Sequence, residues 1–182
     1  MKISSFEITS RLLFIRPYKL SDAASLFELI NSNKNILKDY FPMSVENNTS
    51  VMASRKYILE RNSDRKNGKS LFAGIFTADG KQLVGQICAK DINWRVPKCE
   101  AGYFIDKNYL QKGIGSEALR LFSDYCLEKL EIVKITLRIE PKNIASKKLA
   151  EKCGYVMIGL AKNDFRSSTG RLMECELWEK IR

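Results

Sequence analysis

Histidine is absent from the 182 residues of this chain. That absence excludes a Ser-His-Asp or Cys-His nucleophile system, zinc chemistry of the H-E-x-x-H type and any histidine general base. Acid–base chemistry in this protein must therefore use carboxylates, hydroxyls, lysines, thiols or water.

Cysteine is sparse and scattered along the sequence. The chain has five cysteines, an odd number, and no two of them form a C-x-x-C pair: Cys88, Cys99, Cys126, Cys153 and Cys175. This pattern argues against a disulfide framework and against a cysteine zinc site. We expect reduced, mostly buried thiols in a cytosolic protein, and no bound metal.

Long apolar runs are also missing. No stretch approaches the roughly 18 residues that a membrane-spanning helix needs, and the first residues lack the apolar segment of a signal peptide. We therefore expect a cytoplasmic protein with no membrane partner.

Acidic residues are fewer than basic ones, 21 against 31, which gives a formal net charge of +10. Such a surplus favours polyanionic partners, for example a phosphate-rich cofactor or a ribonucleoprotein surface. Because the charge is spread along the chain, an ordinary soluble protein with a basic pI would explain it as well. No RRM, KH or helix-turn-helix signature is present, so nucleic acid is not an expected ligand.

The sequence contains no repeat, no low-complexity tract and no Pro/Gly-rich linker, so we expect one domain over residues 1–182. Its periodicities predict the order β-α-α-β-β-β-α-β-α-β-β, a mixed α/β pattern. The predicted strands are 12–16, 71–77, 83–92, 101–105, 133–140, 155–160 and 172–178. The predicted helices are about 22–31, 47–62, 114–129 and 143–153.

Several local features refine this prediction. The turn Asp79-Gly80 predicts an antiparallel hairpin, and Ser21 and Asp22 are candidate N-caps for the first helix. Alternation over 133–140 predicts a strand whose buried face carries Val133, Ile135, Leu137 and Ile139. Asn143 can cap the last helix, and Gly154 suits its C-terminal end.

The most informative stretch is 103–119, in which a strand leads through a loop with Gly113 and Gly115 into a long amphipathic helix. Free backbone N–H groups and the helix dipole make such a helix start a site for anions. Glycines let the backbone approach a phosphate closely, although a flexible turn alone would also explain them. The stretch matches neither the P-loop pattern nor the dinucleotide-binding loop, since the third glycine position of the latter is Ala118.

Two motifs in this chain resemble those of the GNAT acetyltransferase superfamily. The stretch 103–119 resembles its Q/R-x-x-G-x-G/A loop, and 143–155 resembles N-x-x-[AS]-x-x-L-x-x-x-x-G-[FY]. Residues 10–17 with Asp22, and residues 100–103, resemble the ribosomal-protein N-acetyltransferase branch. The resemblance covers nearly the whole chain. It implies the GNAT fold, with a mixed central sheet of about six to seven strands flanked by about four helices.

The resemblance also implies how acetyl-CoA, the co-substrate, would bind. Its pyrophosphate would meet backbone N–H groups of the loop: Gln111, Lys112, Gly113, Ile114, Gly115 and Ser116. Its pantetheine arm would pair with the strand formed by Tyr103, Phe104 and Ile105. Asn143 would bind that arm or act as a plain N-cap, or both. Lys112, Lys147 and Lys148 would meet phosphates or remain solvated surface lysines.

The resemblance implies direct attack of a neutral amine on the thioester. Glu100 is the candidate base, acting through water, or else a surface or ion-pair residue. Ser146 is the candidate that assists the sulfur. Tyr103 and Tyr155 are reserve donors or core residues. The tyrosine that donates the proton in many relatives is replaced here by Ala150.

The loop departs from the family pattern as well, since Leu110 stands at the Q/R position and Gln111 where glycine is common.

The identity of the amine remains open at the level of sequence. A protein N-terminus, such as that of a ribosomal protein, or a small amine such as an amino acid, polyamine or antibiotic would fit. A non-catalytic acyl-CoA sensor or nucleic-acid-binding module is a further alternative. The segment 38–43 is expected to line the acceptor groove, and a homodimer is possible.

Overall fold

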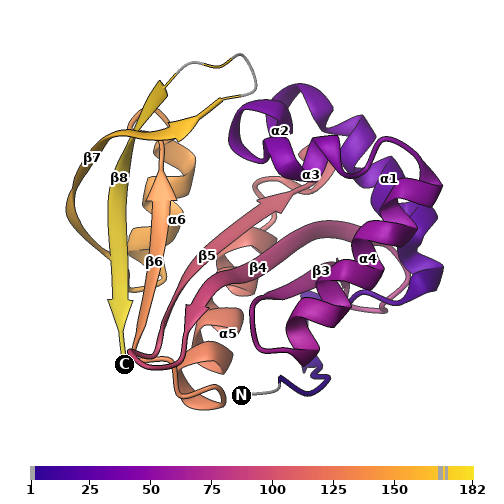
Figure 1. The fold of residues 1–182 in the computed structure, drawn as a ribbon, viewed down its shortest axis with the longest axis horizontal. Helices are drawn as coiled ribbons and strands as arrows, with labels where there is room; N and C mark the ends of the chain where they lie inside the picture. Colours follow the sequence, from indigo (N-terminus) through magenta and orange to yellow (C-terminus); the bar gives the residue numbers. More distant parts are fainter. Residues whose placement is uncertain (1–2, 168–169, 171) are drawn as a thin grey trace.

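The computed structural model describes residues 3–167, 170 and 172–182, and its centre is one mixed sheet (Figure 1). The order of strands across the sheet is β1-β2-β3-β4-β5-β6-β8-β7. The strands are β1 (Ile8–Thr9), β2 (Leu13–Pro17), β3 (Leu71–Thr77), β4 (Leu83–Asn93), β5 (Lys98–Ile105), β6 (Lys134–Ile139), β7 (Val156–Arg166) and β8 (Leu172–Ile181). The helices are α1 (Ala23–Ser32), α2 (Lys34–Tyr40), α3 (Pro42–Glu46), α4 (Val51–Lys66), α5 (Ile114–Glu128) and α6 (Ile144–Lys152). Two short 3₁₀ turns cover Leu20–Asp22 and Lys107–Tyr109.

The predicted mixed α/β class and element order are confirmed. The described part of the chain adds one strand, β1, and two helices, α2 and α3, to the predicted elements. These three elements have two, seven and five residues, too few for a periodic pattern to show. They are held by tertiary packing, for example through Leu37, which is buried against the α1–α4 side; short helices gain most of their stability in this way.

The local predictions hold at the hairpin and fail at two other positions. Strands β3 and β4 pair antiparallel, and Gly80 between them has a φ of 72°. Asp22 occupies the N-cap position of α1, but its side chain makes no capping hydrogen bond to that helix, because its carboxylate pairs with Arg16 at 2.7 Å and accepts from the Lys19 amide. Val133 is 40% exposed, since β6 begins one residue later.

Helices cover both faces of the sheet, and each layer has its own apolar core. On one side α5 and α6 pack against the sheet through Phe122, Leu119 and Ala150, which are fully buried. On the other side α1 and α4 pack through residues such as Leu26 and Ile58. Burying one leucine, isoleucine or phenylalanine side chain stabilises the folded state by about 1.5–3 kcal/mol. The two helical layers therefore hold the sheet in place from both sides.

The sheet opens between β5 and β6, and this opening positions the candidate site. The two strands pair in parallel only over Lys98–Glu100 and Lys134–Thr136. Beyond Glu100, β5 continues to Ile105 paired with β4, whereas β6, which is paired with β8 along its whole length, continues without β5. Figure 1 shows the two strands diverging from this point. The β5 edge from Ala101 to Ile105 is therefore without a strand partner in the described part of the chain.

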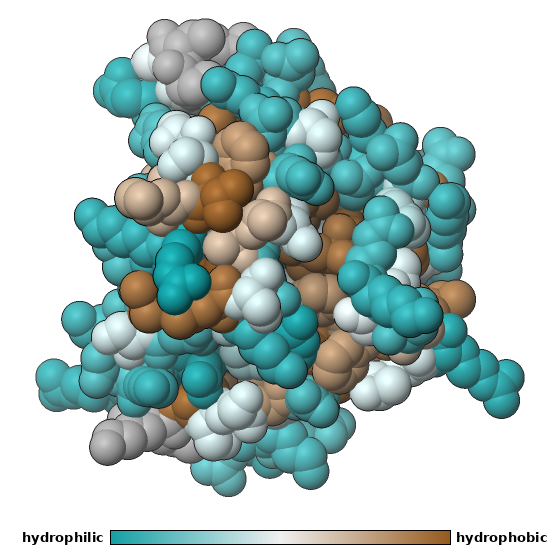
Figure 2. Space-filling view, turned by 90° about the vertical axis from the view of Figure 1, so that its right-hand side faces the viewer, coloured by the Kyte–Doolittle hydropathy of each residue, from teal (hydrophilic) through white to brown (hydrophobic). Residues whose placement is uncertain are grey.

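The surface seen in Figure 2 is mostly hydrophilic, with apolar side chains visible in a furrow between hydrophilic ones. Among the described residues, no helix is long and apolar enough to span a membrane.

Candidate active site

A cavity of about 1020 Å³ lies where β5 and β6 diverge. Its walls include the β5 edge with the facing end of β6, the start of α5, the start of α6 and the segment α2–α3, and residues of α4, β3, β4, β7 and β8 complete them. The residues predicted to bind the cofactor or to catalyse line it together, namely Glu100, Tyr103, Phe104, Ile105, Gln111, Gly113, Gly115, Ser116, Asn143 and Ser146. Lys112 and Ile114, also predicted there, are not among the lining residues.

The start of α5 presents a run of free amides. The first amide of this region with a backbone acceptor is that of Glu117, which donates to the Gly113 carbonyl at 3.0 Å. The amides from Gln111 to Ser116 have no acceptor among the residues that the structure describes. With the positive end of the 15-residue helix α5 behind them, these donors are arranged in a way that suits an anion. Ile114 and Lys112 can contribute their amides although their side chains lie outside the cavity.

The two loop glycines differ in what they contribute. Gly113 has a φ of 78°, in the left-handed region that favours glycine. At Gly115 a Cβ would lie 2.9 Å from Leu149 Cδ1 on α6, so a side chain there would make the end of Leu149 shift. Gln111 also has a positive φ, 61°, which is a physical reason for glycine being common at this position in relatives. That conformation costs a residue with a side chain about 1 kcal/mol.

Asn143 caps α6, as one of its two predicted roles requires. Its Oδ1 accepts a hydrogen bond from the Ser146 amide at 3.0 Å. Its Nδ2 group has no partner among the described residues, and Asn143 lines the cavity. The cap therefore leaves an amide donor available for a ligand.

The two reserve tyrosines have different surroundings. Tyr103 lines the cavity, and its Oη lies 2.8 Å from Ser146 Oγ. Burial raises the pKa of Tyr103 to about 12. Tyr155 is a core residue instead, bonded to Ser123 Oγ at 2.7 Å, and burial raises its pKa as well. Alanine has no hydroxyl and Tyr155 does not line the cavity, so neither Ala150 nor Tyr155 brings a hydroxyl to it.

Glu100 is held in an ion-pair network at the point where β5 and β6 separate. One carboxylate oxygen lies 2.8 Å from Lys90 Nζ, and the other lies 3.0 Å from Arg138 Nε. Arg138 also reaches Asp164 on β7 at 3.0 Å. The ion-pair interpretation of Glu100 is therefore confirmed, and its role as a base stays a prediction. Sequence reasoning missed Lys90 and Arg138, since only the folded sheet brings them to Glu100.

The three lysines considered as phosphate ligands, Lys112, Lys147 and Lys148, have different surroundings. Lys147 pairs with the buried Glu176 at 2.8 Å and is structural. Lys112 donates to the Asn108 carbonyl at 2.9 Å. Lys148 lines the cavity, and so does Lys152, which sequence reasoning missed because its position follows only from the packing of α6.

The acceptor side is formed by α2 and α3. Tyr40, Phe41, Pro42 and Met43 line the cavity as predicted, whereas Lys38 and Asp39 do not. Tyr40 Oη donates to Glu140 Oε2 at 2.6 Å and so bridges from α2 to the end of β6. Sequence reasoning missed other apolar residues of the lining, among them Phe72 on β3, Phe165 on β7 and Met173 on β8.

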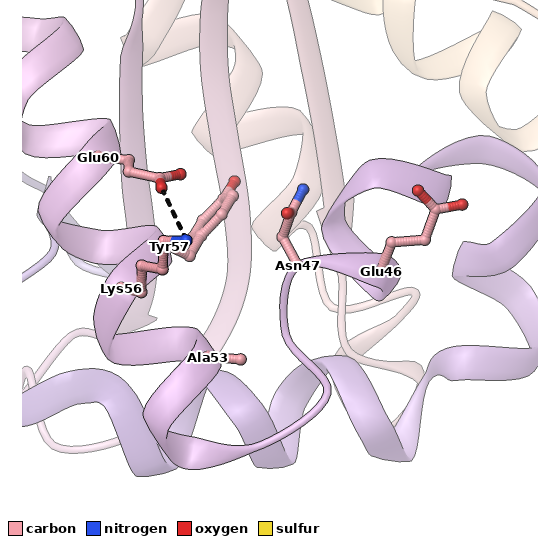
Figure 3. A pocket seen from close by; sticks show the side chains of 6 residues that line it. All are labelled: Glu46, Asn47, Ala53, Lys56, Tyr57 and Glu60. Atoms are coloured by element: carbon pink, nitrogen blue, oxygen red, sulfur yellow. Dashed lines mark ion pairs between the residues drawn. The ribbon is translucent and has the colours of Figure 1, made fainter.

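A second hollow of about 180 Å³ lies between α3 and α4 (Figure 3). It shares Asn47 and Tyr57 with the large cavity, so the two are neighbours. Lys56 and Glu60, drawn as an ion pair in Figure 3, line it on the α4 side. Within the described residues, no group of three or more His, Cys, Asp or Glu side chains could hold a metal ion.

Comparison with known proteins identifies the family. The pattern of the family described as "Acetyltransferase (GNAT) domain" matches residues 12–156. YdaF of Bacillus subtilis (strain 168), named as a candidate ribosomal N-acetyltransferase, is 30% identical over 152 residues, covering 82% of this chain and 80% of YdaF. This chain therefore belongs to the GNAT acetyltransferase family, whose members use acetyl-CoA as co-substrate.

Solved structures show the same fold. The ribosomal-protein-S5-alanine acetyltransferase of Vibrio fischeri superposes with a TM-score of 0.87 at 21% identity, covering 98% of this chain and 96% of that one. RimJ of Mycobacterium smegmatis, in complex with CoA-disulfide, has a TM-score of 0.86 at 18% identity, covering 97% and 86%. Within the family, the chain is thus similar to acetyltransferases of the ribosomal-protein branch.

Proposed function

We propose that this acetyltransferase modifies the N-terminal amine of a protein, with a ribosomal protein as the first candidate. The observation that carries the proposal is the cavity itself, about 1020 Å³, which extends from the α5 amides to an apolar wall on α2 and α3. Such a cavity has room for an extended chain beside the cofactor. The similarity to YdaF and to the Vibrio fischeri enzyme supports the choice, and a net charge of +10 suits a ribonucleoprotein surface.

In the proposed complex, the amides of Gln111–Ser116 bind the diphosphate of acetyl-CoA. The free edge of β5 from Ala101 to Ile105 pairs with the amide groups of the pantetheine arm, in the place that a neighbouring strand would take. Asn143 donates from Nδ2 to the same arm while its Oδ1 keeps the cap on α6. The thioester end of the cofactor then lies along β5, toward Glu100 and away from the amides of Gln111–Ser116.

The proposed reaction needs no covalent enzyme intermediate. The acceptor nitrogen forms a bond to the carbonyl carbon, the carbon–sulfur bond breaks, and its electron pair goes to sulfur. Holding both reactants in one cavity supplies much of the rate, and amides of β5 polarise the carbonyl. The nitrogen loses its proton to water, with Glu100 as the proposed acceptor at the end of that path.

A small amine is the second candidate acceptor. The Tyr40–Glu140 hydrogen bond spans the acceptor side at 2.6 Å, and a mouth narrowed in this way would suit a small substrate. We also propose that the protein is cytoplasmic and that it forms a homodimer.

The experiment is an acetyl-CoA turnover screen against N-terminal peptides of ribosomal proteins and against a panel of small amines. We expect kcat/KM to be highest for a peptide, and we expect Tyr40→Phe, which removes the bridge, to leave peptide turnover intact or raise it. Higher kcat/KM for a small amine than for every peptide would overturn the protein-N-terminus assignment in favour of the alternative. Acetyl-CoA binding without turnover on any amine would favour a sensor.

A further inference from the structure

The departing sulfur needs a hydrogen-bond donor, and the position that supplies one in many relatives cannot do so here. That position is Ala150, which is fully buried in the α6 face of the core. Tyr155, the other nearby tyrosine, is committed to Ser123. Among the hydroxyls that line the cavity, those of Tyr103, in β5, and Ser146, on α6, contact each other.

These two hydroxyls come from opposite walls of the opening. Tyr103 is in β5, at the centre of the edge that lacks a strand partner, and Ser146 is in the first turn of α6. Their oxygens are 2.8 Å apart, although the residues are 43 positions apart in the sequence. The Ser146 backbone is fixed in turn by the Asn143 cap, so the pair is anchored on both sides.

Acidity decides the direction of this hydrogen bond. A phenol is a stronger acid than an aliphatic alcohol, so Tyr103 is the better donor and Ser146 Oγ the better acceptor. Once Ser146 accepts from Tyr103, its own proton is directed away from the tyrosine and into the cavity. Burial raises the pKa of Tyr103 to about 12, so Tyr103 keeps its proton and remains a donor through the neutral and moderately alkaline range.

We infer that Tyr103 is a positioning residue, which holds Ser146 so that the Ser146 hydroxyl donates to the sulfur of coenzyme A. The inference rests on the proposed binding mode along β5. In the reaction, the carbon–sulfur bond breaks with its electron pair on sulfur, the Ser146 hydrogen bond stabilises the thiolate, and the thiolate then takes a proton from water. The serine and the tyrosine end the cycle as they began it.

The first test does not need an acceptor. Coenzyme A is bound to the wild-type protein, Tyr103→Phe and Ser146→Ala, and ionisation of its thiol is followed against pH by the ultraviolet absorbance of the thiolate. A hydrogen bond to the thiolate lowers the pKa of the bound thiol, so we expect that pKa to rise by about one pH unit in either variant. An unchanged thiol pKa in Tyr103→Phe overturns the inference.

The matched control is Tyr155→Phe, which removes a tyrosine hydroxyl from the core rather than from the cavity. It should leave the pKa of the bound thiol unchanged even if it lowers thermal stability. A similar rise in this control would show that general loosening of the fold, and not the Tyr103–Ser146 contact, sets the thiol pKa, and would count against the inference.

Kinetics separate positioning from packing. With an amine that the wild type acetylates, Tyr103→Phe should lower kcat about tenfold and leave the KM for acetyl-CoA unchanged, since the lost contact acts on the leaving sulfur. Adding Tyr103→Phe to Ser146→Ala should cause no further loss, because the tyrosine acts through the serine. Two outcomes contradict the inference. One is that the kcat losses of the two single variants multiply in the double variant. The other is that the KM for acetyl-CoA falls, which would mean that the cofactor must break the Tyr103–Ser146 hydrogen bond in order to bind.

The two proposals can fail separately. If the wild type acetylates no amine, the acceptor proposal fails, and the thiol titration still decides the role of Tyr103. If the wild type binds no coenzyme A, both fail.

Discussion

At the scale of single residues, Glu100 shows how a folded environment alters what a side chain can do. A glutamate at the mouth of a substrate cavity suits a general base, yet two cations hold its oxygens, Lys90 at 2.8 Å and Arg138 at 3.0 Å. Its side chain is only 14% exposed. A carboxylate so placed can receive a proton only through a water that reaches it past these partners.

We predict that Glu100→Gln lowers kcat at neutral pH by about 100-fold, the lower end of what a general base contributes. Glutamine keeps the shape of the side chain but cannot take a proton. The measurement is kcat of the wild type and the variant over a range of pH.

Asp164→Asn is the matched control, because it removes the other carboxylate from Arg138 and Asp164 does not line the cavity. Equal losses in both variants would assign the effect to the ion-pair network. An unchanged pH profile in Glu100→Gln would remove Glu100 from the mechanism.

At the scale of elements, the starts of α5 and α6 carry the site. The α5 start supplies amides, and its geometry depends on Gly113, whose φ lies in the left-handed region, while Gly115 leaves room for the Leu149 side chain of α6. The α6 start supplies Asn143 and Ser146, with the asparagine as cap. Both parts of the site are helix N-termini. Backbone N–H donors without a partner in the helix occur only in the first turn, so a site built from such donors lies there.

The two roles of Asn143 can be separated by one substitution. Asn143→Asp keeps an oxygen for the cap and places a negative charge favourably at a helix N-terminus, but it removes the Nδ2 donor. We predict that thermal stability is retained while the affinity for coenzyme A, measured by calorimetry, falls about tenfold, as expected for one lost hydrogen bond.

Asn143→Ala is the comparison variant, since it loses both roles and should also cost about 1 kcal/mol of stability. If Asn143→Asp binds coenzyme A as tightly as the wild type, the side chain is a cap alone.

At the scale of the whole molecule, the cavity exists because the sheet divides. Two apolar layers clamp the sheet, and between β5 and β6 the pairing ends after Glu100. Filling this opening with a ligand that binds only the folded state must stabilise the fold.

We predict that coenzyme A at 100 times its dissociation constant stabilises the protein by about 2.7 kcal/mol and raises Tm by about 5–10 °C. Pantetheine, which lacks the diphosphate, should give a much smaller shift at the same concentration. The coenzyme A shift should shrink at high salt, because charge attraction is screened. Equal shifts for the two ligands would show that the α5 amides do not bind the diphosphate.

The sequence by itself determined the elements with clear periodicity and the local geometry of the loop. The range predicted for β3 agrees with the structure, and the start predicted for α5 at Ile114 and the cap at Asn143 agree as well. These features depend on residues within a few positions of each other, so their signals lie in short stretches of sequence. The family follows from two such local motifs.

Only the tertiary structure decided which side chains contact each other around the opening between β5 and β6. The Tyr103–Ser146 contact, the Lys90–Glu100–Arg138 network and the Tyr40–Glu140 bridge join residues from different elements. The short helices α2 and α3 likewise depend on packing rather than on their own sequences. No local sequence pattern encodes these contacts. The distance between the two residues of each pair depends on where β5 and β6 stop pairing, and the end of that pairing depends on how both helical layers pack against the sheet.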